Sequence, residues 1–533
     1  MKSGCLVAVA FLLVCGSGIP SWSQTDRGTI TGTVTDSSGA VVANAKVTAK
    51  ASNTGAERST TTSNEGSYTL PELPAAPYQV KVEAQGFKSA SKSLQLGVQV
   101  TSRVDFKLDV GSGGETITVT AEGQAIQTES AVTQTNVSEK QVRELPLQVS
   151  AEFGGRTPLS FIFLDSSITS TTGTGVTSRG TDASTFRVNG GQAQGTAILI
   201  DGAGTQRAQN GTFFSEVGPG PDAFQEFTVS TSSYSSEFGS SSGGVVNFTI
   251  KSGGNGYHGE AYDLLRNTSL NANSFINNSN KLPRNVDREN DFGFNIGGPV
   301  WIPKVYKGIN RTFFFFNFEG YRFTQGENVL LTVPTAKMHT GDFSELLTDP
   351  YVVNFFGGPV SIYDPHVAPD ARTQIPGNRL DLYTNSNGLS IIDPAGQAIL
   401  DHFPMPTSDG VFHNYRASSI IPTTMNNYVA KMDQVISERQ HLSGSYSYRT
   451  QDAIKGGFPR FPLPFIAQDV WHQIFKSHFA RAQYDYTASP TLLNHLNLAW
   501  SRTEVANTNT GMGHIPSVEL GFPADATQNV AFP

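Results

Sequence analysis

Two kinds of residue are scarce in this sequence of 533 amino acids: cysteine and charged residues. There are two cysteines, Cys5 and Cys15, and charged residues make up 15% of the chain, against about 25% in ordinary globular domains. The net charge of −8 is spread along the chain without a basic patch, which excludes an electrostatic footprint for nucleic acid. No apolar run after the N-terminus approaches the ~18 residues that a membrane-spanning helix needs. A membrane protein with this sequence would therefore have to cross as β-strands.

The N-terminus has the pattern of a secretory signal. Lys2 supplies the positive charge, residues 6–14 form a short apolar core, and Ser21-Trp22-Ser23 is a small-x-small cleavage site. We expect residues 1–23 to be removed, and both cysteines with them. The mature protein would then have no thiol for disulfides, thiolate metal sites or nucleophilic catalysis.

Residues 24–110 predict a small β-sandwich. Short period-two segments are separated by turn signals such as Ser38-Gly39 and Gln85-Gly86; the segments are GTITGTVTD, AKVTAKAS, a Thr-rich stretch ending in GSYTL, YQVKVEA and RVDFKLDV. Such regular spacing is typical of an immunoglobulin-like sandwich. A generic extracellular β-domain fits the same pattern.

Residues 111–251 predict a compact α+β domain. After a short Gly/Ser linker the segment ETITVTAEG predicts a strand, and Ser138 with Gln141 three residues later is a capping box that opens a short helix. In the segment ILIDG the apolar residues predict a buried strand, and Asp201-Gly202 predicts the turn that ends it.

Residues 252–533 alternate apolar and polar side chains in segments of roughly ten residues, which is the pattern of a transmembrane antiparallel β-barrel. Asn317 and Glu319 would face a wet lumen. The residues predicted to face lipid are Phe314, Phe316, Phe318, Leu496, Leu498 and Trp500. A soluble protein of two sheets could show the same alternation.

The connections between these segments differ in length. Tight turns are predicted at Ser437-Glu438-Arg439 and Ala488-Ser489-Pro490, whereas residues 323–425 form a long irregular stretch rich in Pro, Asp and Asn. In outer-membrane barrels the long loops are extracellular and the short turns periplasmic. Strands of this length allow only about seven to nine of them after residue 255.

The order of motifs resembles a known family. Gly28-x-Ile30-x-Gly32-x-Val34-x-Asp36 with the later Glu65-Gly66-x-Tyr68 resembles the carboxypeptidase regulatory-like domain. The motifs VNGG, LIDG, GGVVNFTIKSG, HGEAYDLLRN, FGFNIGGP, TFFFFNFEGYR and IPGNRL follow in the order of the Oar-like TonB-dependent outer-membrane receptors. The resemblance implies a transthyretin-like sandwich, a plug domain, and the start of a large transmembrane barrel of about 22 strands. The chain is therefore expected to be the N-terminal half of a longer receptor or a truncated chain.

The resemblance also implies a function. It predicts an outer-membrane receptor of a Gram-negative bacterium that takes up a scarce solute, such as a glycan or a siderophore, without a cofactor. A periplasmic TonB-type protein would supply the energy, and the sandwich and plug would lie on the periplasmic side. Arg187 and Asp201 are candidate ligand contacts on the plug. The alternative is a non-transporting cell-surface adhesin, or a carbohydrate-binding protein that uses the sandwich.

Enzyme motifs are weak in this chain. Gly239 to Gly243 match G-x-S-x-G around Ser241, but a nucleophile elbow needs a helix after the turn, and here a strand is predicted. His472 and His478 share one strand face without a third metal ligand. No phosphate-binding loop or His-Glu-x-x-His motif occurs. We expect neither catalysis nor a metal site.

Overall fold

The computed structural model describes most of the chain after residue 25. It covers residues 26–509 and Gly521, with internal gaps at 112–115, 121–128, 146–148, 151–154, 157, 171–185, 193–194, 208–210, 213–217, 237, 240, 456–470 and 490–491. The predicted signal segment lies outside the described residues, as do Arg179-Gly180 and Pro490. None of the helices in the described part has the length and apolarity that crossing a bilayer requires.

The N-terminal unit is a two-layered β-sandwich, as predicted. One sheet contains β4 (Ser67–Leu73), β1 (Gly28–Asp36), β7 (Thr101–Arg103) and β8 (Phe106–Leu108). The other has the order β3 (Glu57–Thr61), β2 (Lys46–Ala51), β5 (Ala76–Glu83), β6 (Ser89–Leu96) and β9 (Thr116–Thr120). Alternating residues of both sheets fill one apolar core, including Ile30, Val47, Val80 and Phe106.

The sandwich is larger than predicted. Strand β9 lies in the segment ETITVTAEG, which the sequence assigned to the next domain, but it pairs in parallel with β6. Strand β6 itself was not predicted, because its sequence SASKSLQL has few apolar residues. Below, "the sandwich" means residues 26–120.

The next unit, here called the middle domain (residues 133–251), is built on a five-stranded sheet. Its order is β10 (Thr133–Ser138), β19 (Phe224–Ser232), β20 (Val245–Ile250), β15 (Ala197–Ile200) and β16 (Ala203–Gly204). The predicted capping box is present: Gln141 N–H donates to the Ser138 side chain at the start of α2 (Glu139–Glu144). Smaller elements are β11 (Val149–Ser150), β12 (Gly155–Arg156), η1 (Pro158–Leu164), β13 (Ile168–Ser170), β14 (Phe186–Val188), β17 (Gln206–Arg207), β18 (Gly211–Thr212) and η4 (Pro221–Ala223).

The third unit is a seven-stranded antiparallel sheet, here called the wall. Its order follows the sequence: β21 (His258–Arg266), β22 (Asp287–Pro299), β25 (Thr312–Leu331), β26 (Tyr415–Ser437), β27 (Gln440–Lys455), β28 (Trp471–Ser489) and β29 (Leu492–Asn509). A small hairpin, β23 (Trp301–Ile302) with β24 (Tyr306–Lys307), lies between β22 and β25. The strand number agrees with the predicted seven to nine, and β26 turns into β27 at the predicted Ser437.

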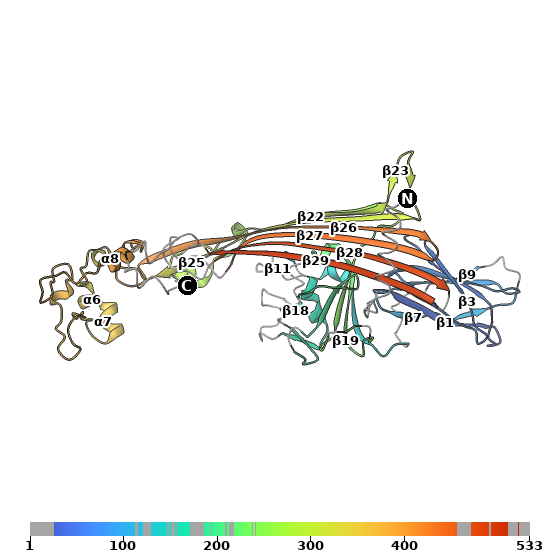
Figure 1. The fold of residues 1–533 in the computed structure, drawn as a ribbon, viewed down its shortest axis with the longest axis horizontal. Helices are drawn as coiled ribbons and strands as arrows, with labels where there is room; N and C mark the ends of the chain where they lie inside the picture. Colours follow the sequence, from blue (N-terminus) through green and yellow to red (C-terminus); the bar gives the residue numbers. More distant parts are fainter. Residues whose placement is uncertain are drawn as a thin grey trace, which may run out of the picture.

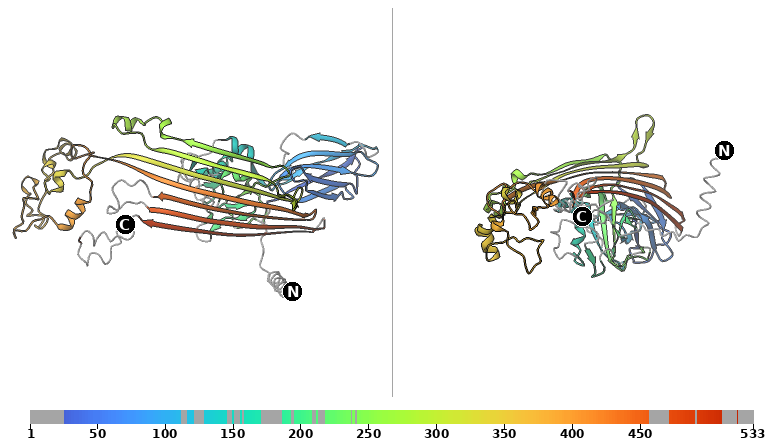
Figure 2. Two further views of the ribbon diagram at one scale, coloured as in Figure 1. Left: turned by 90° about the horizontal axis from the view of Figure 1, so that it is seen from above. Right: turned by 60° about the vertical axis from the view of Figure 1, so that its left-hand side comes forward.

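The three units are arranged around the wall. Figure 1 shows the wall curving over the middle domain, with the sandwich at the end where the short turns lie. The segment between β25 and β26, residues 332–414, forms a separate body beyond the opposite end, here called the loop domain (Figures 1 and 2). Its helices are α5 (Ala336–His339), α6 (Glu345–Thr348), α7 (Pro350–Phe356), η6 (Pro376–Asn378) and α8 (Pro394–Asp401), and η5 (Thr268–Leu270) and α4 (Phe275–Ser279) lie in the β21–β22 connection.

The middle domain packs on the concave face of the wall. Phe315, Val429 and Phe479 of the wall belong to the same apolar cluster as the core of the middle domain, which includes Phe227 and Phe248. The chain leaves the middle domain after β20 and enters the wall at β21. The joint predicted from the sequence between these two strands is thus confirmed.

Candidate functional site: a buried charge cluster between the three units

Asp201 lies in the turn that follows β15, and this turn is the predicted ILIDG turn. Asp201 and Gly202 both have positive φ, 48° and 75°, a conformation that Asp adopts more readily than most residues and Gly most readily of all. Strand β20 holds the turn in place, since Ile250 N–H donates to Asp201 Oδ1 at 2.9 Å. Gly202 N–H donates to the side chain of Asn247 at 3.1 Å. Asp201 is completely buried.

The second carboxylate oxygen of Asp201 is bound by two cations of the wall. Arg481 Nη1 on β28 lies 3.0 Å from Asp201 Oδ2, and Lys431 Nζ on β26 lies 3.3 Å from the same oxygen. The lysine also donates to the backbone oxygen of Ile250 at 2.9 Å. The strand register explains the geometry: Lys431 is opposite Ser445, and Ser445 is opposite Arg481. The small serine between the two long side chains leaves room for the carboxylate.

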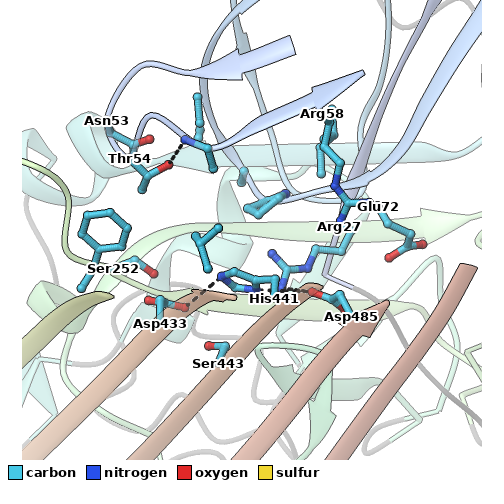
Figure 3. Close-up of a pocket in the computed structure, with 18 of the residues that line it drawn as sticks. Arg27, Asn53, Thr54, Arg58, Glu72, Ser252, Asp433, His441, Ser443 and Asp485 are labelled. Carbon is cyan, nitrogen blue, oxygen red and sulfur yellow. Dashed lines mark hydrogen bonds and ion pairs between the residues drawn. The ribbon is translucent and has the colours of Figure 1, made fainter. Parts of the chain in front are cut away.

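The segment before β1 enters the same cluster from the sandwich. Arg27 Nη2 lies 2.8 Å from Asp485 Oδ2 on β28, and Asp26 Oδ2 lies 3.9 Å from Arg481 Nη2. Figure 3 shows Arg27 reaching Asp485 beside His441. Arg481 is therefore shared by Asp26 of the sandwich and Asp201 of the middle domain.

The charges in this cluster are mutually compensating. Burial acts to raise the pKa of Asp26, but the positive charges of Arg27 and Arg481 outweigh it and lower the pKa below its ordinary value. Burial acts to lower the pKa of Arg27, and Asp485 and Asp26 more than offset it and raise the pKa. The charge cluster is defined as Asp26, Arg27, Asp201, Lys431, Asp433, His441, Arg481, Asp485 and His495, with the two histidines 3.5 and 2.6 Å from Asp485.

A cavity of about 110 Å³ adjoins the charge cluster. The sandwich, the middle domain and the wall all contribute to its lining, through residues that include Arg58, Glu72, Gln225, Asp433 and Asp485 (Figure 3). Such a volume holds only a few water molecules. The three units therefore pack closely at the short-turn end of the wall.

The sandwich also contacts the middle domain directly. Glu226 on β19 accepts a hydrogen bond from Val98 N–H at 2.5 Å, and Gln225 donates to the backbone oxygen of Ala75 at 3.2 Å. Burial raises the pKa of Glu226 to about 7, and the Val98 hydrogen bond only partly counters this effect.

The two predicted ligand residues lie in different surroundings. Arg187 is exposed on β14, opposite Thr169 of β13. Asp201 is enclosed, and both of its carboxylate oxygens are bonded to protein groups. The prediction that Asp201 forms a turn after a buried strand is confirmed, whereas binding of a solute by either residue stays a prediction.

The outer face of the wall carries the residues that were predicted to face lipid. Along β25 the even-numbered Phe314, Phe316 and Phe318 are half-buried, while Phe313 and Phe315 are buried toward the middle domain. The same holds on β29, where Leu496 is half-buried and Leu498 and Trp500 are exposed. The predicted inward Asn317 and Glu319 are completely buried.

A row of rings crosses this outer face in register, which sequence reasoning missed. Phe294, Phe318, Tyr428, Tyr448 and His478 lie on five neighbouring strands, each directly opposite the next. Their ring centroids are 5.9, 5.1, 6.2 and 4.7 Å apart. We call this the aromatic row. The signal was present as single aromatics on outward positions, but only the strand register aligns them.

The enzyme-like motifs have structural partners. The Ser241 hydroxyl lies within hydrogen-bonding distance of the backbone oxygens of Gly195 and Gly244, and a strand follows it. His472 contacts Asp452 at 2.5 Å, and His478 contacts the Tyr446 hydroxyl at 2.7 Å. Among the described residues no group of three or more His, Cys, Asp or Glu could hold a metal ion.

The loop domain combines negative charge with exposed rings. Nine acidic and three basic residues lie in residues 332–414, so the negative charge is concentrated here and is not evenly spread as the sequence analysis assumed. Tyr351 stacks on Phe412 with centroids 4.1 Å apart and on Phe355 at 6.0 Å. All three rings are exposed to solvent. This surface was missed because the rings are 57 or more residues apart from Phe412's partner helix to Phe412 itself in the sequence.

Comparison with known proteins agrees with this architecture. Residues 249–533 match the family described as outer membrane beta barrel domain, and residues 29–109 match the carboxypeptidase regulatory-like domain. The TonB-dependent transporter Oar of Myxococcus xanthus is 27% identical over 310 residues, which are 56% of this chain and 27% of that protein. The match thus spans little more than a quarter of the relative's length.

Solved structures of transporters share the fold more distantly. The outer membrane transporter YddB of Escherichia coli is 11% identical with a TM-score of 0.38, covering 69% of this chain and 38% of that one. A ferric enterobactin receptor (PfeA) variant of Pseudomonas aeruginosa is 12% identical with a TM-score of 0.35, covering 71% and 42%. Because the barrel family matches more than half of the chain, the protein belongs to the outer membrane beta barrel domain family of Gram-negative bacteria, with a carboxypeptidase regulatory-like domain ahead of the barrel.

Proposed function

We propose that this protein is part of a TonB-dependent outer-membrane transporter and that the middle domain is its plug. The plug fills the concave side of the wall and shares an apolar core with it through Phe315, Val429 and Phe479. A large barrel without such a filling would be an open aqueous channel. Similarity to the transporter Oar supports the same assignment.

One observation carries this proposal: Asp201 of the plug is held between Lys431 and Arg481 of the wall. A buried ion pair contributes little net stability when it is complete, because desolvation offsets attraction, but it is costly when one partner leaves. Such a contact gives one defined closed position rather than a strong seal. A plug that must move and return needs this behaviour.

The sandwich is proposed to lie on the periplasmic side, since it packs at the short-turn end of the wall. Asp26 and Arg27 connect it to the same Arg481 and Asp485 that hold the charge cluster together. We propose that a periplasmic TonB-type partner disturbs this cluster and thereby releases Asp201. The adhesin alternative is less well supported, because the sandwich is packed against the plug and wall rather than presented alone.

The loop domain is proposed to make the first contact with the solute. Its excess of carboxylates repels anions, and the exposed stack of Tyr351, Phe355 and Phe412 offers flat apolar faces. These features favour a neutral glycan over an anionic metal chelate. Growth of cells carrying the full gene on oligosaccharides, compared with growth on ferric chelates as the iron source, distinguishes the two solutes.

Transport itself is tested by locking the plug. Gly220 of the plug lies against Glu319 of β25, since a Cβ at Gly220 would fall 1.3 Å from Glu319 Oε2. Cysteines at these two positions should cross-link under oxidation, abolish solute-dependent growth, and restore it after reduction. Each single-cysteine variant is the control and should grow under both conditions. Unchanged growth with a cross-link demonstrated on a gel would refute the plug.

A further inference from the structure

The β23–β24 hairpin leaves the plane of the wall. Figure 1 shows it standing on the side of the sheet opposite the middle domain, and Figure 2 shows the same from a second direction. Two hydrogen bonds fix the bend at its base: Val300 N–H donates to Thr312 O, and Gly308 N–H donates to Val300 O, both at 2.8 Å. A Cβ at Gly308 would lie 2.5 Å from Val300 O, so the bend needs glycine. The hairpin is thus a built projection.

The side chains of this hairpin are unusual for a surface turn in water. Trp301, Ile302 and Val305 are 60%, 50% and 79% exposed, although each loses free energy by staying in water. Lys304 and Lys307 are exposed beside them. Tryptophan with lysine is the combination enriched where a membrane meets water, because the ring sits at the headgroups and the amine reaches the phosphates.

The outer face of the wall shows where the membrane lies. On the long-loop side of the aromatic row the outward residues become charged, with Arg322, Asp452, Lys476, Arg502 and Glu504. On the short-turn side the exposed large side chains are apolar or aromatic: Ile296, Met432, Ile436, Leu442, Tyr446, Tyr486, Leu498 and Trp500. The aromatic row therefore marks the outer boundary of an apolar band.

The lower boundary of this band falls at the base of the hairpin. On β28 the band runs from His478 to Tyr486, which corresponds to roughly 20 Å of height for a tilted strand. The hairpin begins directly after Pro299 at the end of β22 and ends just before Thr312 at the start of β25, at the short-turn end. A projection from this level meets the leaflet on the short-turn side.

We infer that the hairpin of residues 301–307 is a membrane anchor in the phospholipid headgroup region on the short-turn side of the barrel. Trp301, Ile302 and Val305 enter the boundary of the acyl chains, and Lys304 and Lys307 bind lipid phosphates. The shape fits this partner, since a short hairpin that extends sideways from a barrel can only lie along the lipid surface. The inference rests on the barrel fold and does not require transport.

The test uses the full-length protein refolded into phosphatidylcholine vesicles with or without phosphatidylglycerol. The sequence has cysteines only at positions 5 and 15, so Val305→Cys in the processed protein carries a single thiol for an environment-sensitive dye. We expect blue-shifted emission, and stronger quenching by lipids brominated near the headgroup than by lipids brominated at the chain ends. Leu389→Cys, 63% exposed in the loop domain, is the matched control and should report water.

The lysines give a second measurement. Replacing Lys304 and Lys307 by Gln should lower the affinity of the labelled hairpin for anionic vesicle surfaces about fivefold per lysine, while the refolded barrel stays intact on a heat-modifiability gel. A dye at position 305 that iodide quenches as readily as the dye at Leu389 would overturn the proposal. Protection that follows protein concentration and not lipid composition would also overturn it, because the partner would then be a second copy.

Discussion

Replacing Asp201 by Asn tests whether the charge cluster determines the position of the plug. The amide keeps the size of the carboxylate and can still accept the hydrogen bond from Ile250 N–H. What it removes is the negative charge between Lys431 and Arg481. The fold of the turn should therefore survive, and only the attachment to the wall should change.

The size of the effect follows from the surroundings of the two cations. Removing one partner of a buried ion pair costs about 3 to 5 kcal/mol. Arg481 keeps Asp26 at 3.9 Å, and Lys431 keeps its bond to the Ile250 backbone oxygen. We therefore expect the lower end, about 3 kcal/mol, which raises the population of the displaced plug by roughly two powers of ten.

Hydrogen exchange on the full-length protein in lipid measures this change where it occurs. The amides of β20 should exchange about a hundredfold faster in Asp201→Asn, and ion conductance across a planar bilayer should rise. Asp409→Asn, which removes an exposed carboxylate of the loop domain, is the matched control and should change neither. Unaltered exchange in β20 with unaltered conductance would show that the cluster does not hold the plug.

Three further predictions test other contacts. Because a carboxyl with a raised pKa binds more protons in the packed state, the contact of Glu226 with the sandwich should be strongest at low pH and lose up to about 3 kcal/mol as pH rises from about 4.5 to 7; Glu226→Gln should remove this dependence of the urea midpoint. Gly220→Ala should destabilise the packed plug by about 1 to 3 kcal/mol or more because the new methyl group meets Glu319, whereas Gly204→Ala, with open space around it, should have little effect in the same urea titration. Phe316→Arg should cost about 2 to 4 kcal/mol of refolding free energy in vesicles, and Thr324→Arg, outward but beyond the aromatic row, close to none; equal costs would contradict the assigned band.

Local chemistry was enough to predict several elements. Strand β1 has the bounds that the alternation of GTITGTVTD predicts, and the helix after Ser138 begins where its capping box predicts. These features depend on residues close together in the sequence. Strand β6 was missed for the same reason: SASKSLQL lacks local apolar contrast, and its place in the sheet comes from pairing with β5 and β9.

The charge cluster could not be predicted because its members are far apart in the sequence. Asp201 and Arg481 are separated by 280 residues, and Arg27 and Asp485 by 458. Period-two alternation shows which face of a strand a residue occupies, but not its neighbour on another unit. The available signal was a charged residue at an inward position: Lys431 and Arg481 both have that parity on their strands. Such residues in a barrel wall point to a partner inside.

The composition of the interface favours a plug that moves over one that is permanent. A permanent filling would be expected to bury large apolar side chains along the whole wall, yet the completely or nearly buried inward residues of the wall are mostly polar, including Asn317, Glu319, Asn427, Ser443, Ser445, Arg481 and Gln483. Apolar contacts with the plug core are concentrated at Phe315, Val429 and Phe479. Polar groups can exchange protein partners for water at small net cost, so a displaced plug leaves a wall that water can solvate. The few ion pairs then decide where the plug returns, which is why the loss of one charge at Asp201 should be visible in transport before it is visible in the fold.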